Sequence, residues 1–222
     1  MTGQGEVVEI TPDLMIRAYA VGLFPMAPDA DATELEWYDP PMRGVLPLDA
    51  FHVPRRLYRT VMSGRFEIVS DRDFHATITA CAQPAPGREQ TWINDQIIDL
   101  FCRLHDMGYA HSVETWRDGR LVGGLYGVSI GGAFFGESMF SRERDASKVA
   151  LVHLVARLRV GGYALLDTQF GTAHLATFGG VEIPAADYKH RLRQAIAMPA
   201  SWPDEGKSSQ IVAAMRAIRA GG

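Results

Sequence analysis

The pattern of apolar and polar positions divides the chain into a short proline-rich start and a longer region with clear helix and strand periods. Residues 11–13, Thr-Pro-Asp, are typical of a helix start, because Thr caps the first turn and Pro suits its first position. Gly22 indicates where that helix ends. Residues 25–48 are rich in proline and weakly periodic, so irregular structure is predicted there. These features predict a small N-terminal lobe over residues 1–43, a main domain over 44–202 and a tail over 203–222.

The main domain alternates between strand-like and helix-like periods. The expected elements are, in order, a strand at 66–69, helices from about 71 and 95, strands at 111–117, 120–128 and 133–136, a helix capped by Asp145, a strand at 164–169 and a helix opened by Pro184. The Asp118-Gly119 pair is typical of a hairpin turn between two of these strands. This order favours an α+β (mixed α/β) fold whose antiparallel sheet runs into a parallel strand.

Composition narrows the class of protein. The chain of 222 residues is 47% hydrophobic with a net charge of −4, which fits one globular domain, or a domain plus a lobe, and disfavours a protein that coats nucleic acid. No apolar run is long enough for a membrane span, and the first residues lack the features of a signal peptide. Cys81 and Cys102 do not suffice for a disulfide framework or a cysteine-based zinc site, so a reducing cytoplasm is expected.

The segment 123–148 carries the strongest chemical signal. It combines repeated glycines and aromatic residues with one acid, Glu137, in the length of a hairpin. Glycine inside a strand is costly and often marks close approach of a ligand or another chain. A carboxylate among apolar neighbours also needs a partner, which makes Glu137 a candidate for catalysis. A tight hairpin with a capping acid explains the same pattern, and both readings stay open on these residues alone.

Eight short motifs then point to one family. They are GLFPM (22–26), TWI (91–93), HSVETW (111–116), LVGGLYGV (121–128), FFGESMFSR (134–142), DASK (145–148), LLDTQ (165–169) and EIPAADY (182–188). In this order they resemble the leucyl/phenylalanyl-tRNA–protein transferases over about residues 10–195. The run GESMFSR followed by ASK is the most specific of them.

The resemblance implies a GNAT-like acyltransferase fold and an aminoacyltransferase. Such an enzyme moves Leu or Phe, less often Met, from aminoacyl-tRNA to the N-terminal Lys or Arg of proteins, which marks them for N-degron-dependent degradation. The resemblance further implies a cytoplasmic monomer that needs neither a cofactor nor a metal nor a membrane. Among the residues, it implies that Asp167, Gln169 and Glu137 are catalytic. Because Asp167 and Gln169 are two apart on a strand, we expect both side chains on one face, with Asp167 orienting the Gln169 amide.

The resemblance also implies three binding regions. The pocket for the donor side chain maps onto Leu125, Phe134, Met139, Leu151, Leu154 and Leu166. Trp92 matches a tryptophan that packs against the terminal adenosine, and Met26 stands where relatives have a second tryptophan. A cluster without acids, Arg55, Arg56 and Arg59, is by itself typical of a solvated face, and the resemblance favours a tRNA contact instead.

Two other functions compete with this interpretation. An acyl-CoA-dependent acyltransferase needs a glycine-rich phosphate loop, and residues 142–147, RERDAS, lack those glycines. A non-catalytic tRNA- or peptide-binding module would not need Asp167 and Gln169. The histidines form no metal-binding motif, since His105 and His111 fall on different predicted elements, and His111 and His174 are interpreted as structural.

Overall fold

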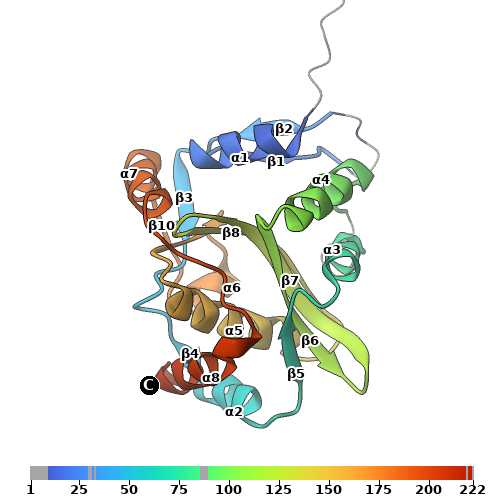
Figure 1. Cartoon of the computed structure of the whole chain (residues 1–222), viewed down its shortest axis with the longest axis vertical. Coiled ribbons are helices and arrows are strands. Elements are labelled where there is room, and N and C mark those ends of the chain that lie inside the picture. The colour runs from blue at the N-terminus through green and yellow to red at the C-terminus, as the bar shows by residue number, and fades with distance from the viewer. Residues whose placement is uncertain (1–9, 30–31, 33, 86–89, 219, 222) are drawn as a thin grey trace, which may run out of the picture.

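A computed structural model describes residues 10–221 except 30–31, 33, 86–89 and 219. Figure 1 shows helices packed on both sides of a curved sheet. The helices are α1 (Pro12–Ala20), α2 (Arg55–Met62), α3 (Phe74–Ala82), α4 (Asp95–Asp106), α5 (Ala146–Gly161), α6 (Ala173–Ala176), α7 (Ala185–Ile196) and α8 (Ser208–Ala217), with a short 3-10 turn, η1 (Glu205–Lys207). The strands are β1 (Phe24–Met26), β2 (Glu36–Tyr38), β3 (Met42–Val45), β4 (Val53–Pro54), β5 (Glu67–Ser70), β6 (Ala110–Arg117), β7 (Arg120–Ile130), β8 (Ala133–Ser141), β9 (Leu165–Gln169), β10 (Val181–Pro184) and β11 (Ala220–Gly221).

The central sheet has seven strands in the order β10-β3-β9-β8-β7-β6-β5. All its neighbours are antiparallel except β8 and β9, which run parallel. That parallel pairing covers Ala133–Phe135 against Leu165–Asp167 and ends there. The mixed α+β class and the parallel strand are therefore confirmed, while the GNAT-like assignment remains a prediction. The divergence of β8 and β9 opens a place between two strands where side chains from both can meet.

Two hydrophobic clusters cover the two faces of the sheet. Figure 1 shows α3 and α4 on one side and α5 with α8 on the other. The first cluster takes residues from α1, α3, α4 and α7, and the second takes them from α2, α5 and α8. Neighbouring residues of one strand point to opposite faces, so Phe135 belongs to the first cluster and Phe134 to the second. The sheet is thus buried on both faces, and α5 is buried on almost every side.

Two glycines of β7, Gly123 and Gly127, allow close packing within the chain. A Cβ atom on Gly127 would lie 2.3 Å from the Phe135 carbonyl oxygen and 2.5 Å from the Phe134 ring. A Cβ on Gly123 would lie 2.5 Å from that of Ala146, where α5 begins. The expected partner of such an approach was a ligand or another chain, whereas the atoms that crowd Gly123 and Gly127 belong to this chain.

Three local predictions were wrong or incomplete. Residues 25–48 are not wholly irregular, because β1 pairs with β2 and β3 enters the central sheet. The arginine-rich segment forms a helix, α2, which had not been predicted. Asp145 stands at the start of α5 as predicted, with a φ of 68°, but its side chain does not cap the helix. Its carboxylate accepts from Lys148 Nζ at 3.2 Å instead. The Ser141 hydroxyl accepts from the Ser147 N–H in the first turn.

The C-terminal segment folds back onto the main domain. Helix α8 packs on α5, and Ile211, Met215 and Ile218 join the second cluster. Strand β11 pairs with β4 immediately before α2. The division into a lobe, a main domain and a tail stays a prediction, but this tail is anchored to the sheet's second face. Among the described residues, no helix combines the length and the apolar character that crossing a membrane requires.

Candidate active site

The candidate site lies where β8 and β9 stop pairing. Its most deeply buried part is an ion pair. Arg43 on β3 and Asp167 on β9 are 1% and 0% exposed. Arg43 Nη2 donates to Asp167 Oδ2 at 2.7 Å, and its Nε lies 3.0 Å and 3.1 Å from the two carboxylate oxygens. A bidentate geometry of this kind compensates two buried charges far better than a single contact does.

Further hydrogen bonds and aromatic contacts hold both members of this ion pair. The Tyr188 hydroxyl donates to Asp167 Oδ2 at 2.6 Å, and Arg43 Nη1 donates to the Gly22 carbonyl at 3.0 Å. The guanidinium carbon lies 4.4 Å and 4.6 Å from the ring centres of Phe24 and Tyr188. Burial and then the negative charge of Asp167 raise the pKa of Tyr188 far above its usual range, so its hydroxyl stays a donor. Asp167 is therefore held rigidly inside the protein.

Glu137 on β8 is the second carboxylate of the site. Its Oε1 accepts from the Tyr19 hydroxyl at 2.7 Å, and its Oε2 accepts from Gln169 Nε2 at 2.9 Å. Burial raises the pKa of Glu137 to about 7, and the nearby Asp167 adds to this, although the two hydrogen bonds and Arg43 oppose it. Such a carboxyl changes protonation close to neutral pH, as a proton-transfer group must. Part of the residue remains accessible to solvent.

Gln169 connects the two carboxylates in a way that the sequence did not predict. Its main-chain N–H donates to Asp167 Oδ1 at 2.7 Å, while its side-chain amide donates to Glu137. Gln169 has a φ of 63°, so its backbone departs from the regular strand, although its amide still meets Glu137 in the network that also holds Asp167. The expectation that Asp167 orients the side-chain amide was therefore wrong in its geometry. Asp167 fixes the backbone of Gln169, and Glu137 fixes its amide.

The sequence reasoning missed three residues of this network: Arg43, Tyr19 and Tyr188. Arg43 lies in the proline-rich segment that was expected to be irregular. Tyr188 stands in one of the quoted motifs, EIPAADY, but no role was given to it. Asp167 lies on a short apolar strand, and a buried carboxylate needs a partner. Its position therefore indicated that a buried cation should lie nearby.

The six predicted donor-pocket residues lie on the second-cluster side of the sheet, opposite to Glu137. Leu125, Phe134, Leu151, Leu154 and Leu166 are buried in the second cluster, and Met139 packs against it. Glu137 and Asp167 instead contact Tyr19 and Tyr188 of the first cluster. If the ester of the donor lies near Glu137, the side chain of its amino acid must therefore pass between β8 and β9, where they diverge, to reach these residues. Their pocket role stays a prediction.

The two residues expected to contact adenosine lie on the same side as Glu137. Trp92 and Met26 are both partly exposed and pack against the first cluster. Met26 belongs to β1, whose neighbour Phe24 contacts Arg43. This places both side chains on the side of the sheet from which a nucleotide could approach the acid. Their role in binding stays a prediction.

The predicted tRNA-binding arginines occupy α2, at the far end of the molecule from α1 in Figure 1. Arg55, Arg56 and Arg59 are all exposed. Arg56 also lines a cavity of about 500 Å³ together with Arg144 and Lys148, next to the start of α5. Asp145 lies among these cations, 3.6 Å from Arg56 Nη2. Because the Arg56 side chain is 60% exposed and this contact is long, its guanidinium remains able to meet phosphate.

The two buried carboxylates form a site suited to an enzyme that moves protons, and comparison with known proteins gives the family. The sequence model described as "Leucyl/phenylalanyl-tRNA protein transferase" matches residues 45–193, and the model of that family's N-terminal domain matches residues 8–41. The chain therefore belongs to the leucyl/phenylalanyl-tRNA–protein transferase family. The predictions of family and of enzyme class are confirmed.

Several curated relatives carry the same family name. The chain is 61% identical over 197 residues to a leucyl/phenylalanyl-tRNA–protein transferase of Gluconobacter oxydans, which covers 89% of this chain and 88% of that one. The transferase of Paramagnetospirillum magneticum is 59% identical over 195 residues, covering 88% and 93%. That of Rhodopseudomonas palustris strain TIE-1 is 58% identical over 194 residues, covering 87% and 86%. Each of these matches covers 87–89% of this chain.

A solved structure, that of L-PGS from Bacillus licheniformis, is similar only distantly. It shares 12% identity with a TM-score of 0.41, covering 91% of this chain and 68% of that one. A likeness at this level carries no argument about fold or function.

Proposed function

We propose that this protein transfers Leu or Phe from aminoacyl-tRNA to the N-terminal Lys or Arg of acceptor proteins in the cytoplasm, marking them for degradation. The observation that carries the proposal is Glu137, a carboxyl held by Tyr19 and Gln169 with a pKa near 7. Family membership supplies the substrate class, and this carboxyl supplies a group suited to the proton transfer that the reaction needs.

The chemistry requires no covalent enzyme intermediate, because an aminoacyl ester is already activated. The α-amine of the acceptor has an ordinary pKa near 8, so part of it is neutral at physiological pH. Its nitrogen attacks the ester carbonyl carbon, and a nitrogen–carbon bond forms as the bond to the ribose oxygen breaks. The proton lost by the nitrogen passes to Glu137 and from there to the leaving ribose oxygen. The protein's main contribution is alignment, which is worth roughly 7–11 kcal/mol in favourable cases.

The remaining residues of the network position this acid. Asp167 fixes the turn at Gln169, and the Gln169 amide fixes one oxygen of Glu137. Since Arg43 and Asp167 neutralise one another, ionised Glu137 leaves the site with a net negative charge. A negative site favours an acceptor whose first side chain is positive, which supports the choice of Lys and Arg.

Single-turnover transfer tests the proposal directly. The enzyme is mixed with Phe-tRNA and a peptide that starts with Arg, and mass spectrometry follows the added Phe. A matched peptide that starts with Glu controls for acceptor choice, and coenzyme A with an acyl-CoA donor tests the rival acyltransferase. We expect transfer only to the Arg peptide and only from the charged tRNA. Transfer from acyl-CoA, or no transfer from tRNA by folded enzyme, would contradict the proposal.

A further inference from the structure

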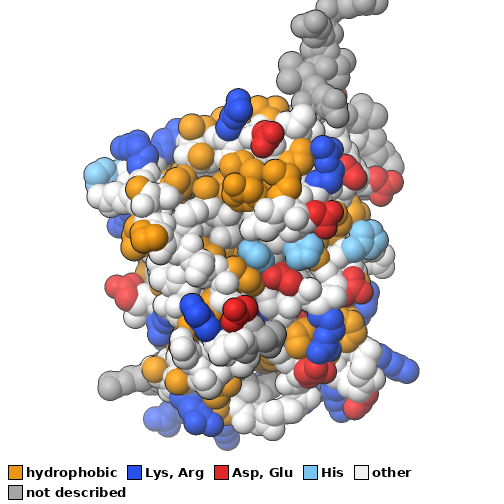
Figure 2. All heavy atoms as spheres, viewed as in Figure 1, with side chains coloured by type: hydrophobic (Ala, Val, Ile, Leu, Met, Phe, Trp, Pro, Cys, Tyr) orange, Lys and Arg blue, Asp and Glu red, His pale blue; other side chains and the backbone are white. Residues whose placement is uncertain are grey.

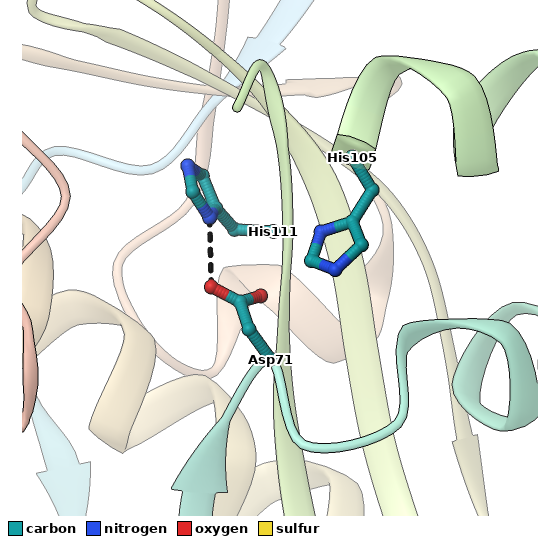
Figure 3. Close-up of side chains that lie close together, drawn as sticks. All are labelled: Asp71, His105 and His111. Carbon is teal, nitrogen blue, oxygen red and sulfur yellow. Dashed lines mark hydrogen bonds and ion pairs between the residues drawn. The ribbon is translucent and has the colours of Figure 1, made fainter. Parts of the chain in front are cut away.

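Three side chains with metal-binding atoms converge at the β5 edge of the sheet, away from the network around Glu137. Asp71 lies in the turn after β5, His105 near the end of α4, and His111 on β6. One donor atom from each lies within 4.8 Å of the others. Figure 3 shows the Asp71 carboxylate pointing up between the two imidazole rings. The sequence hid this cluster because its members come from three different elements.

Their hydrogen bonds leave lone pairs available. His111 Nδ1 lies 2.8 Å from Asp71 Oδ2, and Asp71 Oδ1 accepts from the Ser112 N–H at 2.7 Å. Each carboxylate oxygen has a second lone pair. His105 Nδ1 lies 2.8 Å from the Ala110 carbonyl oxygen, which can only accept. His105 Nδ1 therefore carries the proton and its Nε2 is free to bind a ligand, the arrangement usual for histidines that bind metals.

Aromatic packing and backbone geometry hold the donors in place. The His111 ring stacks on Trp202 with centroids 4.4 Å apart, and the His105 ring stacks on Phe74 at the same separation. Asp71 has a φ of 56°, a conformation that non-glycine residues adopt rarely and that often accompanies functional sites. Ligands fixed in this way lose little freedom when they bind an ion.

We propose that Asp71, His105 and His111 form a binding site for a divalent transition-metal ion of the zinc type, with a remaining position open to solvent. Two imidazoles and one carboxylate are a donor set that suits Zn²⁺, whereas Mg²⁺ and Ca²⁺ prefer oxygen donors alone. Tetrahedral Zn²⁺ with bonds of about 2.0–2.1 Å places its donors roughly 3.3 Å apart. The 2.8 Å pair must open slightly and the wider pairs must close, which side-chain rotation allows.

The cluster is accessible to an ion. The side chains of His111 and Asp71 are 13% and 24% exposed. Figure 2 shows histidine side chains beside acidic ones in the middle of the viewed face. When the ion binds His111 Nδ1, the proton of the neutral ring moves to Nε2, so the ion takes the place of the proton between this ring and Asp71. The ion would join the turn after β5 to α4 and β6, next to Trp202, which also stacks on Phe134 at 5.4 Å.

Titration calorimetry with Zn²⁺ tests the site in the untagged, full-length, chelator-treated protein. The variants are His105→Gln and Asp71→Asn, which are close in shape to the native residues. His190→Gln is the matched control, because His190 is an exposed histidine on α7 that bonds only to Gln194 among the contacts described. We expect one equivalent of Zn²⁺ to bind to the native protein and to the control, and at least about tenfold weaker binding by each ligand variant.

Two further readouts make the outcome decisive. Zn²⁺ should raise the melting temperature of the native protein and of His190→Gln but not of the ligand variants, whose melts without metal also report their folding. Co²⁺ should give the spectrum of nitrogen and oxygen ligands without a thiolate band. Equal affinity in all four proteins, binding no tighter than millimolar, or a thiolate band indicating Cys102 would each overturn the proposal.

Discussion

Arg43 and the arginines of α2 show how differently one residue type is used in two regions of the molecule. Arg43 is 1% exposed, and its guanidinium donates to Asp167 and Gly22 between two aromatic rings. The Arg56 side chain, by contrast, is 60% exposed and has a single long ion pair. A buried cation without its partner is costly, whereas an exposed one is solvated. The first arrangement stabilises a site, and the second leaves charge available to a partner.

The largest expected effect separates these two regions through stability. Arg43→Gln leaves Asp167 buried without its counter-charge, so the free energy of unfolding should fall by about 3–5 kcal/mol. The matched change Arg59→Gln, on the exposed face of α2, should alter it by no more than about 0.5 kcal/mol. Urea unfolding of both variants measures the difference. Similar small decreases in the two proteins would show that the buried pair is not a stabilising unit.

A second prediction concerns the rate of transfer. Glu137→Gln keeps the shape and removes the proton acceptor, so the single-turnover rate should fall by about 10²- to 10⁴-fold. The native rate should rise with pH through about 7, as Glu137 ionises, and this step should vanish in the variant. The exposed-surface change Glu143→Gln is the control, since Glu143 bonds to Arg65 and Arg117 outside the site. A native-like rate and pH profile in Glu137→Gln would refute the assigned role.

The same residue makes stability depend on pH. The pKa of Glu137 is raised in the folded state, from 4.5 to about 7. Its contribution to stability is therefore fully present below about pH 4.5 and is lost as pH rises through 7. At about 1.36 kcal/mol per unit, the native protein should lose up to about 3 kcal/mol relative to Glu137→Gln across this window. Denaturant melts at a series of pH values measure this, and parallel curves would mean that the carboxyl is not perturbed.

The smallest effect belongs to α2. Replacing Arg55, Arg56 and Arg59 together by Gln should raise the KM for aminoacyl-tRNA and make its salt dependence shallower by about 0.7–0.9 for each phosphate that is no longer neutralised. The unfolding free energy should hardly change. A short aminoacyl-adenosine donor, which lacks the acceptor stem, is the control and should react normally. An equal decrease with both donors would assign these arginines to structure rather than to RNA.

The catalytic candidates were accessible from sequence because they lie in short, distinctive motifs. Glu137, Asp167 and Gln169 were named in advance, and the structure brings them together, although their roles remain predictions. Local patterns also predicted α1, α4 and the β6–β7 hairpin, since caps and turns depend on neighbouring residues. Each of these features is encoded by residues that are close together in the sequence.

The rest of the site depends on contacts between distant parts of the chain. Arg43 pairs with Asp167 across 124 positions, and Tyr19 with Glu137 across 118. Nothing near Arg43 marks it, because β3 is short and follows two prolines, and its strand partners come from much later in the sequence. The turn at Gln169 was missed for a related reason. Its positive φ accommodates tertiary contacts and follows no glycine or asparagine signal.

The position of Arg43 has a consequence for folding cooperativity. The sequence model of the family's N-terminal domain ends at residue 41 and that of the main part begins at residue 45, so Arg43 falls between them. Yet its guanidinium binds the Gly22 carbonyl after α1 and the carboxylate of β9 at once. Opening the lobe alone would strip a buried cation of one acceptor. Amide hydrogens of α1 and β9 should therefore exchange as a single cooperative unit, although the sequence divides just there.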